Sequence, residues 1–240
     1  MAKITREKFK TRNNVFDAFT ERNLFELASK GLFDEETMSP IKIGKEANVF
    51  SVTKDGEKRA VKIYRLEACD FNRMYEYLAV DPRFSGLKHR KRQIIFNWCK
   101  REYSNLQKAR YHGINCPAPY AYKDNILVMQ FIGDTEPAPQ LKDYYTSKWK
   151  PLYDKTVVML KKLYSEAGIS HGDLSKFNIL VHNNTPFFID FSQSVPLESP
   201  NSRLLLERDA KNIADFFARH GIKTSQEEIL ERVLQKDKKK

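Results

Sequence analysis

Three polar side chains in the second half of the chain are spaced in a way that can support catalysis. Asp173 and Asn178 lie in the stretch HGDLSKFNIL, and Asp190 follows after ILVH, NNTP and FFID. ILVH and FFID are predicted to pair as an antiparallel hairpin, with Asn178 before one strand and Asp190 at the end of its partner. The two side chains then lie close together and offer oxygen ligands, which Mg²⁺ accepts together with water and substrate phosphates.

Asp173 lies upstream of this pair, where a carboxylate can orient and deprotonate an attacking hydroxyl. Each residue alone also fits a structural role: HGD as a polar turn, Asn178 as a cap and Asp190 as the end of a strand. The three together, with the hairpin between them, favour phosphoryl transfer over these separate roles.

A buried cation is predicted in the stretch AVKI, residues 60–63, where Lys62 stands alone among apolar neighbours. Strand alternation directs Ala60 and Lys62 to one side and Val61 and Ile63 to the other. Lys62 can therefore face a cleft, where an ammonium group needs an anion.

Glu102 is the candidate partner of Lys62, because it interrupts an otherwise apolar helical stripe. The alternatives are that Glu102 lies at the edge of the stripe and reaches solvent, or that Glu67 or Glu76 pairs with Lys62. The stripe consists of Ile95, Trp98, Leu106 and Ala109.

Two further stretches suit nucleotide binding. IGKEANVF, residues 43–50, has a single glycine, Gly44, whose neighbouring amides can cover phosphates with help from Lys45; an ordinary hairpin fits it equally well. MQFIG, residues 129–133, suits a hinge that contacts adenine through the backbone of Gln130 and Ile132, or simply the end of a buried strand.

Both strands and helices must position these residues, so we expect an α+β fold. We expect an N-terminal arm and helical segment over 1–40, a first lobe over 41–133, and a second, mainly helical lobe with a basic tail over 134–240. In the first half of the chain, the patterns predict a mobile basic arm over 1–12, a helix ending at Gly31, strands within 41–64 and a mobile basic loop over 65–91. A helix along 95–109 and strands around Asp124 follow, and then a linker over 133–139. The second half is predicted to contain a helix over 152–166, the hairpin and a last helical region.

The composition excludes several classes of protein. Hydrophobic residues make up 41% of the chain, which is typical of a globular protein, and no apolar run is long enough to span a membrane. Three widely spaced cysteines indicate neither a disulfide framework nor a zinc site. MAKITREKFK lacks the apolar core of a secretion signal, so we expect a cytoplasmic protein. The net charge of +11 suits a polyanionic partner such as RNA.

Six motifs together resemble the RIO family of atypical serine/threonine protein kinases. They are GKEANVF, AVKIY, REYSNL, MQFIG, HGDLSKFNIL and IDFSQSV, and the resemblance runs from about residue 15 to about residue 222. Within the family, the chain resembles the first RIO subfamily, the branch without an N-terminal winged helix.

The resemblance implies a two-lobe protein-kinase-like fold, with a sheet and helix in the N-lobe and a compact C-lobe that lacks a peptide-docking extension. It implies that Asp173 is the catalytic base, that Asn178 and Asp190 bind metal, and that Asp190 can itself accept phosphate. The cofactors implied are ATP and Mg²⁺, with Mn²⁺ as an alternative ion. The residues implied in nucleotide binding are Gly44, Lys45, Val49, Lys62, Glu102, Met129, Gln130, Ile132 and Leu180.

The function implied is that of an ATP- and Mg²⁺-dependent kinase or ATPase switch in maturation of the small ribosomal subunit. Its partners would be the subunit precursor and its RNA, and its phosphoacceptor a protein serine or the chain itself. LKHRKR, residues 87–92, is the candidate RNA contact, although a solvated charge run fits as well. Two alternatives are a small-molecule phosphotransferase of the aminoglycoside or choline kinase type, and a catalytically inactive module that binds RNA or the ribosome.

Overall fold

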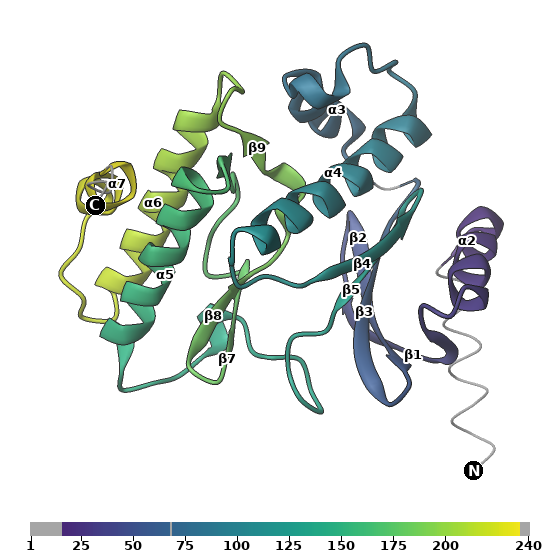
Figure 1. Ribbon diagram of the computed structural model, residues 1–240, viewed down its shortest axis with the longest axis horizontal. Helices are drawn as coiled ribbons and strands as arrows, with labels where there is room; N and C mark the ends of the chain where they lie inside the picture. Colours follow the sequence, from purple (N-terminus) through teal and green to yellow (C-terminus); the bar gives the residue numbers. More distant parts are fainter. Residues whose placement is uncertain (1–15, 68, 236–240) are drawn as a thin grey trace.

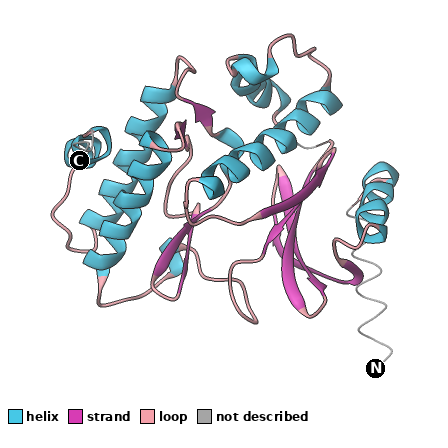
Figure 2. Ribbon diagram, viewed as in Figure 1, coloured by secondary structure: helices cyan, strands magenta, loops and turns pink. Residues whose placement is uncertain are grey.

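The computed structural model describes residues 16–67 and 69–235 and contains two lobes (Figure 1). The arm predicted over 1–12 and the tail from 236 lie outside the described residues. The first lobe contains the larger sheet with helices beside it, and the second lobe is mainly helical with a short hairpin (Figure 2). The first lobe is an antiparallel sheet in the order β1-β2-β3-β5-β4. Its strands are β1 (Asp34–Ile43), β2 (Ala47–Lys54), β3 (Glu57–Tyr64), β4 (Pro119–Lys123) and β5 (Ile126–Gln130).

The side chains of strand β3 alternate between the two faces of this sheet. Val61 and Ile63 are buried in a cluster with Leu24 of helix α2 (Ala18–Ser29). Lys62 and Tyr64 point to the other face, toward helix α4 (Lys91–Tyr111) and the space between the lobes. The alternation predicted for AVKI is confirmed.

The N-terminal helix also follows the prediction, but the first strand does not. Asp17 caps α2 by accepting hydrogen bonds from the amides of Phe19 and Thr20, and Gly31 ends the segment with a φ of +72°. Strand β1 begins at Asp34, well before the predicted start at 41. Its residues alternate only between exposed and half-buried, because it is an edge strand, so its first half has no apolar pattern to detect.

The mobile loop predicted over 65–91 is wrong in its central part. Helix α3 (Phe71–Ala79) and the 3₁₀ turn η1 (Pro82–Phe84) fill it. Helix α3 buries Met74 and Leu78, and Phe71 and Tyr75 pack beside them, so its apolar residues do recur at helical spacing. The prediction overlooked this stripe beside the basic run that follows. The rest of the basic run leads into α4, which begins at Lys91 and confirms the predicted helix.

The second lobe is built around two long helices and a hairpin. Strands β7 and β8 pair from Ile179↔Phe188 to His182↔Thr185, which confirms the predicted hairpin. Asn183 and Asn184 turn the chain with φ angles of 49° and 53°, a conformation that asparagine tolerates. The elements of this lobe are η2 (Leu141–Asp143), α5 (Trp149–Ser165), β6 (Ile169–Ser170), β7 (Ile179–His182), β8 (Thr185–Phe188), η3 (Phe191–Gln193), β9 (Val195–Pro196), α6 (Ser202–Ala218) and α7 (Gln226–Leu234).

A tight turn after β5 connects the lobes. Gly133 pairs with Pro137 in an isolated bridge, and the Ala138 amide donates to the Ile132 carbonyl at 2.9 Å. A Cβ at Gly133 would lie 2.3 Å from the Glu136 carbonyl oxygen, so only glycine fits. The linker is where the sequence predicts it, while the boundary between 133 and 134 stays a prediction. Within the described ranges, no helix is both long and apolar enough to cross a bilayer.

Candidate active site

A cleft of about 650 Å³ lies between the lobes and collects the residues that the sequence singled out. Those that line it are Gly44, Lys45, Val49, Lys62, Glu102, Met129, Gln130, Ile132, Asn178, Leu180 and Asp190. Asp173 does not line the cleft, but it accepts a hydrogen bond from Asn178, which does line it. The chain thus brings residues of the first lobe together with residues of β7 and of the two ends of the β7–β8 hairpin.

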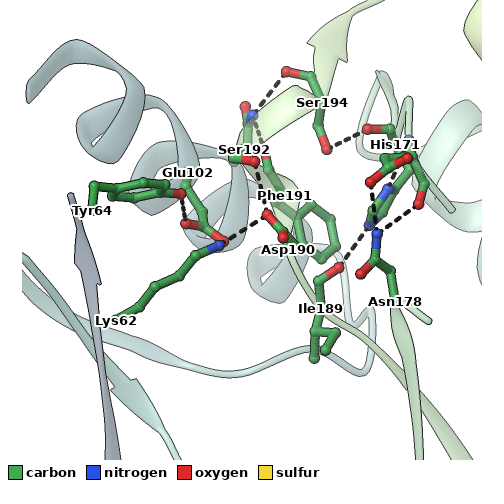
Figure 3. Close-up of polar contacts among 12 residues, drawn as sticks. Lys62, Tyr64, Glu102, His171, Asn178, Ile189, Asp190, Phe191, Ser192 and Ser194 are labelled. Atoms are coloured by element: carbon green, nitrogen blue, oxygen red, sulfur yellow. Dashed lines mark hydrogen bonds and ion pairs between the residues drawn. The ribbon is translucent and has the colours of Figure 1, made fainter. Parts of the chain in front are cut away.

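Lys62 is the centre of the polar contacts in this cleft (Figure 3). Its ammonium lies 2.8 Å from Oε1 of Glu102 and 2.9 Å from Oδ1 of Asp190. Burial acts to lower the pKa of Lys62, but the two carboxylates outweigh burial and raise it. The predicted Lys62–Glu102 pair is therefore present, and the rival partners Glu67 and Glu76 are not used.

Glu102 is buried on α4, with its side chain 1% exposed. Burial raises its pKa, although Lys62 acts in the opposite direction. The hydroxyl of Tyr64 donates a hydrogen bond to its second oxygen, Oε2. Both oxygens of this buried carboxylate thus have a donor, as a buried charge requires.

Asp190 ends the hairpin in a left-handed backbone conformation, with φ 63° and ψ 68°, which turns its side chain toward Lys62. Burial acts to raise its pKa, but Lys62 and a hydrogen bond from the Ser192 hydroxyl hold it at about 2. Its side chain remains 40% exposed. Asp190 is therefore an ionised carboxylate that a ligand in the cleft can reach.

The loop of Asp173 is fixed by a second buried carboxylate, Asp209 of α6. Its two oxygens accept hydrogen bonds from the amides of Gly172 and Leu174, each at 2.8 Å, on either side of Asp173. Burial raises the pKa of Asp209 to about 7, while these two amides act to lower it. Burial and the nearby Asp190 raise the pKa of Asp173 itself.

The amide group of Asn178 connects the loop to the hairpin. Its Nδ2 donates to the carbonyl and to Oδ2 of Asp173, at 2.8 and 2.9 Å. The oxygen Oδ1 of Asn178 and the oxygen Oδ2 of Asp190 accept no hydrogen bond from the described residues. These are hard oxygen donors of the kind that Mg²⁺ prefers.

A metal at this position would need further ligands. The described part of the chain has no group of three His, Cys, Asp or Glu side chains able to hold an ion by themselves. Mg²⁺ usually retains waters and binds substrate phosphates, so one amide oxygen and one carboxylate fit it when a nucleotide is also present.

Two residues of α4 fix the segment that follows Asp190. Asn105 Nδ2 donates to the carbonyls of Phe191 and Ser194 at 3.0 and 2.9 Å, and the buried Arg101 donates to the carbonyl of Ser194 at 3.1 Å. Arg101 also lies 3.4 Å from the buried carboxylate of Asp81, beside η1. The helix that carries Glu102 is thereby tied to the segment that carries Asp190.

Sequence reasoning missed Tyr64, Arg101, Asn105 and Asp209. Asp209 could have been found, because it interrupts the apolar stripe of α6 as Glu102 interrupts that of α4. Arg101 and Asn105 bind backbone carbonyls, which leave no mark in the sequence.

The five-stranded sheet with its helix, the helical second lobe and the cleft between them define the protein-kinase-like fold. The Rio2 kinase–ADP/Mg²⁺–phosphoaspartate complex from Chaetomium thermophilum has this fold, with a TM-score of 0.69 and 22% sequence identity. The match covers 88% of this chain and 64% of that one. The predicted α+β, two-lobe architecture is confirmed.

Sequence comparison identifies the family. The RIO domain matches residues 48–230. The RIO-type serine/threonine-protein kinase Rio1 of Methanocaldococcus jannaschii is 41% identical over 96% of this chain and 79% of its own length. The human serine/threonine-protein kinase RIO1 is 36% identical over 88% of this chain and 38% of its own length. The chain belongs to the RIO family of atypical serine/threonine protein kinases, in the Rio1 subfamily.

Proposed function

We propose that the chain transfers the γ-phosphate of ATP, with Mg²⁺, to a serine of a protein or of the chain itself. The observation that carries this proposal is the position of Lys62, which bridges Glu102 in the first lobe and Asp190 in the second at 2.8 and 2.9 Å. An ammonium at the wall of an open cleft, held by two carboxylates, is placed to bind phosphates.

The hinge suits an adenine ring. The Ile132 amide has no acceptor among the described residues, whereas its carbonyl is already taken by Ala138. The Gln130 amide already donates a hydrogen bond to the Ala118 carbonyl, at 2.8 Å. We therefore assign the backbone donor to Ile132, with Val49 and Leu180 on the apolar walls of the same cleft.

Asp173 acts as the base in this proposal. It takes the proton of the acceptor hydroxyl as the oxygen forms a bond to the γ-phosphorus and the bond to the bridging oxygen of ADP breaks. Asp209 and Asn178 hold Asp173 in place through the hydrogen bonds described above. Bound Mg²⁺ would neutralise phosphate charge, held by Oδ1 of Asn178 and by Asp190.

Asp190 is a second candidate acceptor. The similar Rio2 structure contains a phosphoaspartate, and the oxygen Oδ2 of Asp190 is free of donors from the described residues. In this route the carboxylate attacks the γ-phosphorus, ADP leaves, and water later releases the phosphate. The chain would then act as an ATPase switch.

A transfer assay with labelled ATP, followed by mass spectrometry, tests the proposed function. We expect label on serine, on Asp190 or in released phosphate, dependent on Mg²⁺, and lost in Asp173→Ala. Asp55→Asn, in the exposed turn between β2 and β3, is the control and should keep wild-type transfer. Transfer to an aminoglycoside or to choline, or unchanged transfer by Asp173→Ala, would contradict the proposal.

We further propose that the precursor of the small ribosomal subunit is the partner, bound through its RNA. The side chains at 88–92 are Lys88, His89, Arg90, Lys91 and Arg92, all exposed. Within the described ranges none of them forms an ion pair. Helix α4 begins here without a side-chain cap and without an acidic residue in its first turn, which adds to the positive potential.

The salt dependence of RNA binding tests this partner. Replacing Lys88, Arg90, Lys91 and Arg92 with Gln should reduce the slope of log K against log salt by about 0.7 for each lost phosphate contact. Replacing Lys150, Arg203 and Lys211, which are paired with carboxylates on their own helices, is the control. An unchanged slope in the first variant would exclude this surface.

A further inference from the structure

The polar cluster beside the cleft contains one ammonium and two carboxylates. Lys62 lies between Glu102 and Asp190, so the two carboxylates compete for a single cation. Each carboxylate also accepts from one hydroxyl: Asp190 from Ser192 at 2.7 Å, and Glu102 from Tyr64. The hydroxyl donors therefore influence how Lys62 is divided between its two partners.

Tyr64 is a fixed donor. It is 2% exposed, and its amide donates to the carbonyl of Asn125 at 2.9 Å. Nδ2 of Asn125 donates back to the Tyr64 carbonyl at 2.9 Å and also to Thr20 of α2 at 3.0 Å. Held from both sides of its backbone, Tyr64 keeps its hydroxyl directed at Oε2 of Glu102 (Figure 3).

Loss of that hydroxyl would leave Oε2 of Glu102 buried without a donor. A buried carboxylate oxygen without a partner is destabilised, so the carboxylate rotates toward another donor or takes up a proton, and either change loosens its contact with the Lys62 ammonium. Asp190 keeps its Ser192 hydrogen bond and its exposure to the cleft. The ammonium would shift toward Asp190 and oppose the use of that carboxylate by a metal.

We propose that Tyr64 is a positioning residue for phosphoryl transfer, an inference that rests on the function proposed above. Its hydroxyl keeps Glu102 directed at Lys62, so that Lys62 is held back from Asp190. Asp190 is then available to Mg²⁺, and Lys62 to the phosphates. In this proposal Tyr64 does not contact the reacting groups and acts only through its hydrogen bond to Glu102.

The variant Tyr64→Phe tests this role, with Tyr153→Phe as the matched control. Tyr153 is also buried and hydrogen-bonded, to Thr224 at 2.7 Å, but it lies on α5 in the second lobe. We expect Tyr64→Phe to raise the Mg²⁺ concentration for half-maximal transfer on the order of 10-fold, the size expected for a hydrogen bond to a charged group. At saturating Mg²⁺ and ATP, kcat should stay within about 3-fold of wild type. Tyr153→Phe should change neither quantity.

A double-mutant cycle separates this role from a general loss of packing. Glu102→Gln removes the negative charge to which the Tyr64 hydroxyl donates its hydrogen bond. This variant alone should therefore raise the Mg²⁺ concentration needed for half-maximal transfer. Adding Tyr64→Phe to Glu102→Gln should change it by less than about 2-fold, because the coupling is already broken. If Tyr64→Phe does not fold, Glu102→Gln still tests the competition, and an unchanged Mg²⁺ requirement in that variant refutes it.

The outcomes distinguish this inference from the proposed function. Active wild-type protein with an unchanged Mg²⁺ requirement in Tyr64→Phe overturns the role of Tyr64 and leaves the function standing. A lower melting temperature as the sole effect overturns it as well. If the wild-type protein transfers no phosphate, calorimetric titration of both proteins with ADP and Mg²⁺ decides the same question, since the proposal requires weaker Mg²⁺-dependent binding by Tyr64→Phe.

Discussion

The ammonium of Lys62 lies 2.9 Å from Oδ1 of Asp190, and this contact joins β3 of the first lobe to the end of the hairpin in the second. Residues 128 positions apart in the chain thus meet at the cleft. Because the same ammonium also lies 2.8 Å from Glu102, one side chain links three segments of the fold.

Replacement of Lys62 with Met should destabilise the protein and abolish nucleotide binding. It leaves two buried or half-buried carboxylates without their cation, and breaking such a pair costs about 3–5 kcal/mol. Urea denaturation measures the loss, and calorimetry with ADP and Mg²⁺ measures binding. Lys54→Met, which removes a half-exposed pair with Asp55, should cost less than about 1 kcal/mol. Equal stability of the two variants would contradict a structural role for Lys62.

Asp173→Asn should lower kcat by about 10²- to 10⁴-fold, the usual contribution of a general base. The amide cannot accept a proton from the attacking hydroxyl. Affinity for ADP and Mg²⁺ should change little, because Asp173 lies behind Asn178 rather than on the cleft wall. Rapid-quench transfer and calorimetry on the same sample separate the two effects. A variant that binds weakly and transfers at the normal rate when saturated would mean that Asp173 is a binding residue.

Asp209→Asn should impair catalysis from a distance. An asparagine offers one acceptor oxygen for the two amides that Asp209 now holds at 2.8 Å, so the loop around Asp173 loses one of its attachments. Displacing a catalytic group by about 1 Å can cost on the order of 100-fold in rate. Asp215→Asn changes an exposed carboxylate on the same helix and should keep the wild-type rate. Wild-type transfer by Asp209→Asn would show that the loop is held by other contacts.

His171 should make the stability depend on pH between about 4 and 6.5. Burial lowers its pKa from 6.5 to about 4, so the unfolded chain binds a proton in this window while the folded protein does not. Stability should therefore rise with pH across the window, by about 3 kcal/mol from this residue. The imidazole is neutral in the fold, which agrees with its contact to the Ile189 carbonyl at 3.1 Å and with the Asp173 amide, 3.4 Å from Nδ1.

His171→Gln provides the comparison for this pH dependence. Asp209, with its raised pKa, changes stability in the opposite direction over an overlapping range, so the difference between the two proteins isolates His171. Denaturation curves at several pH values should show a smaller increase of stability with pH in the variant. Parallel curves for the two proteins would mean that His171 titrates normally in the fold.

The parts that the sequence predicts well are those defined by local patterns. The β7–β8 hairpin has its own turn residues and two short apolar strands, so its ends, Asn178 and Asp190, could be placed beside the same cleft. Lys62 and Glu102 could be paired because each breaks an apolar pattern, and a buried charge needs an opposite one.

The parts that it predicts poorly depend on contacts between distant segments. The hydroxyl of Tyr64 reaches Glu102 only because β3 and α4 face one another. The sequence does not show which group a tyrosine hydroxyl will bind, or which backbone carbonyl a buried side chain will reach. The contacts of Tyr64, Arg101 and Asn105 could therefore be identified only from the structure.

The anchoring of helix α4 has a consequence for control of the protein. In protein kinases the position of this helix controls whether the lysine–glutamate ion pair is in place. Here Arg101 and Asn105 donate four hydrogen bonds to carbonyls of residues 191–194, and rotation would break all of them together. The helix that carries Glu102 is thereby fastened to residues 191–194, and we expect it to keep this position when a nucleotide binds.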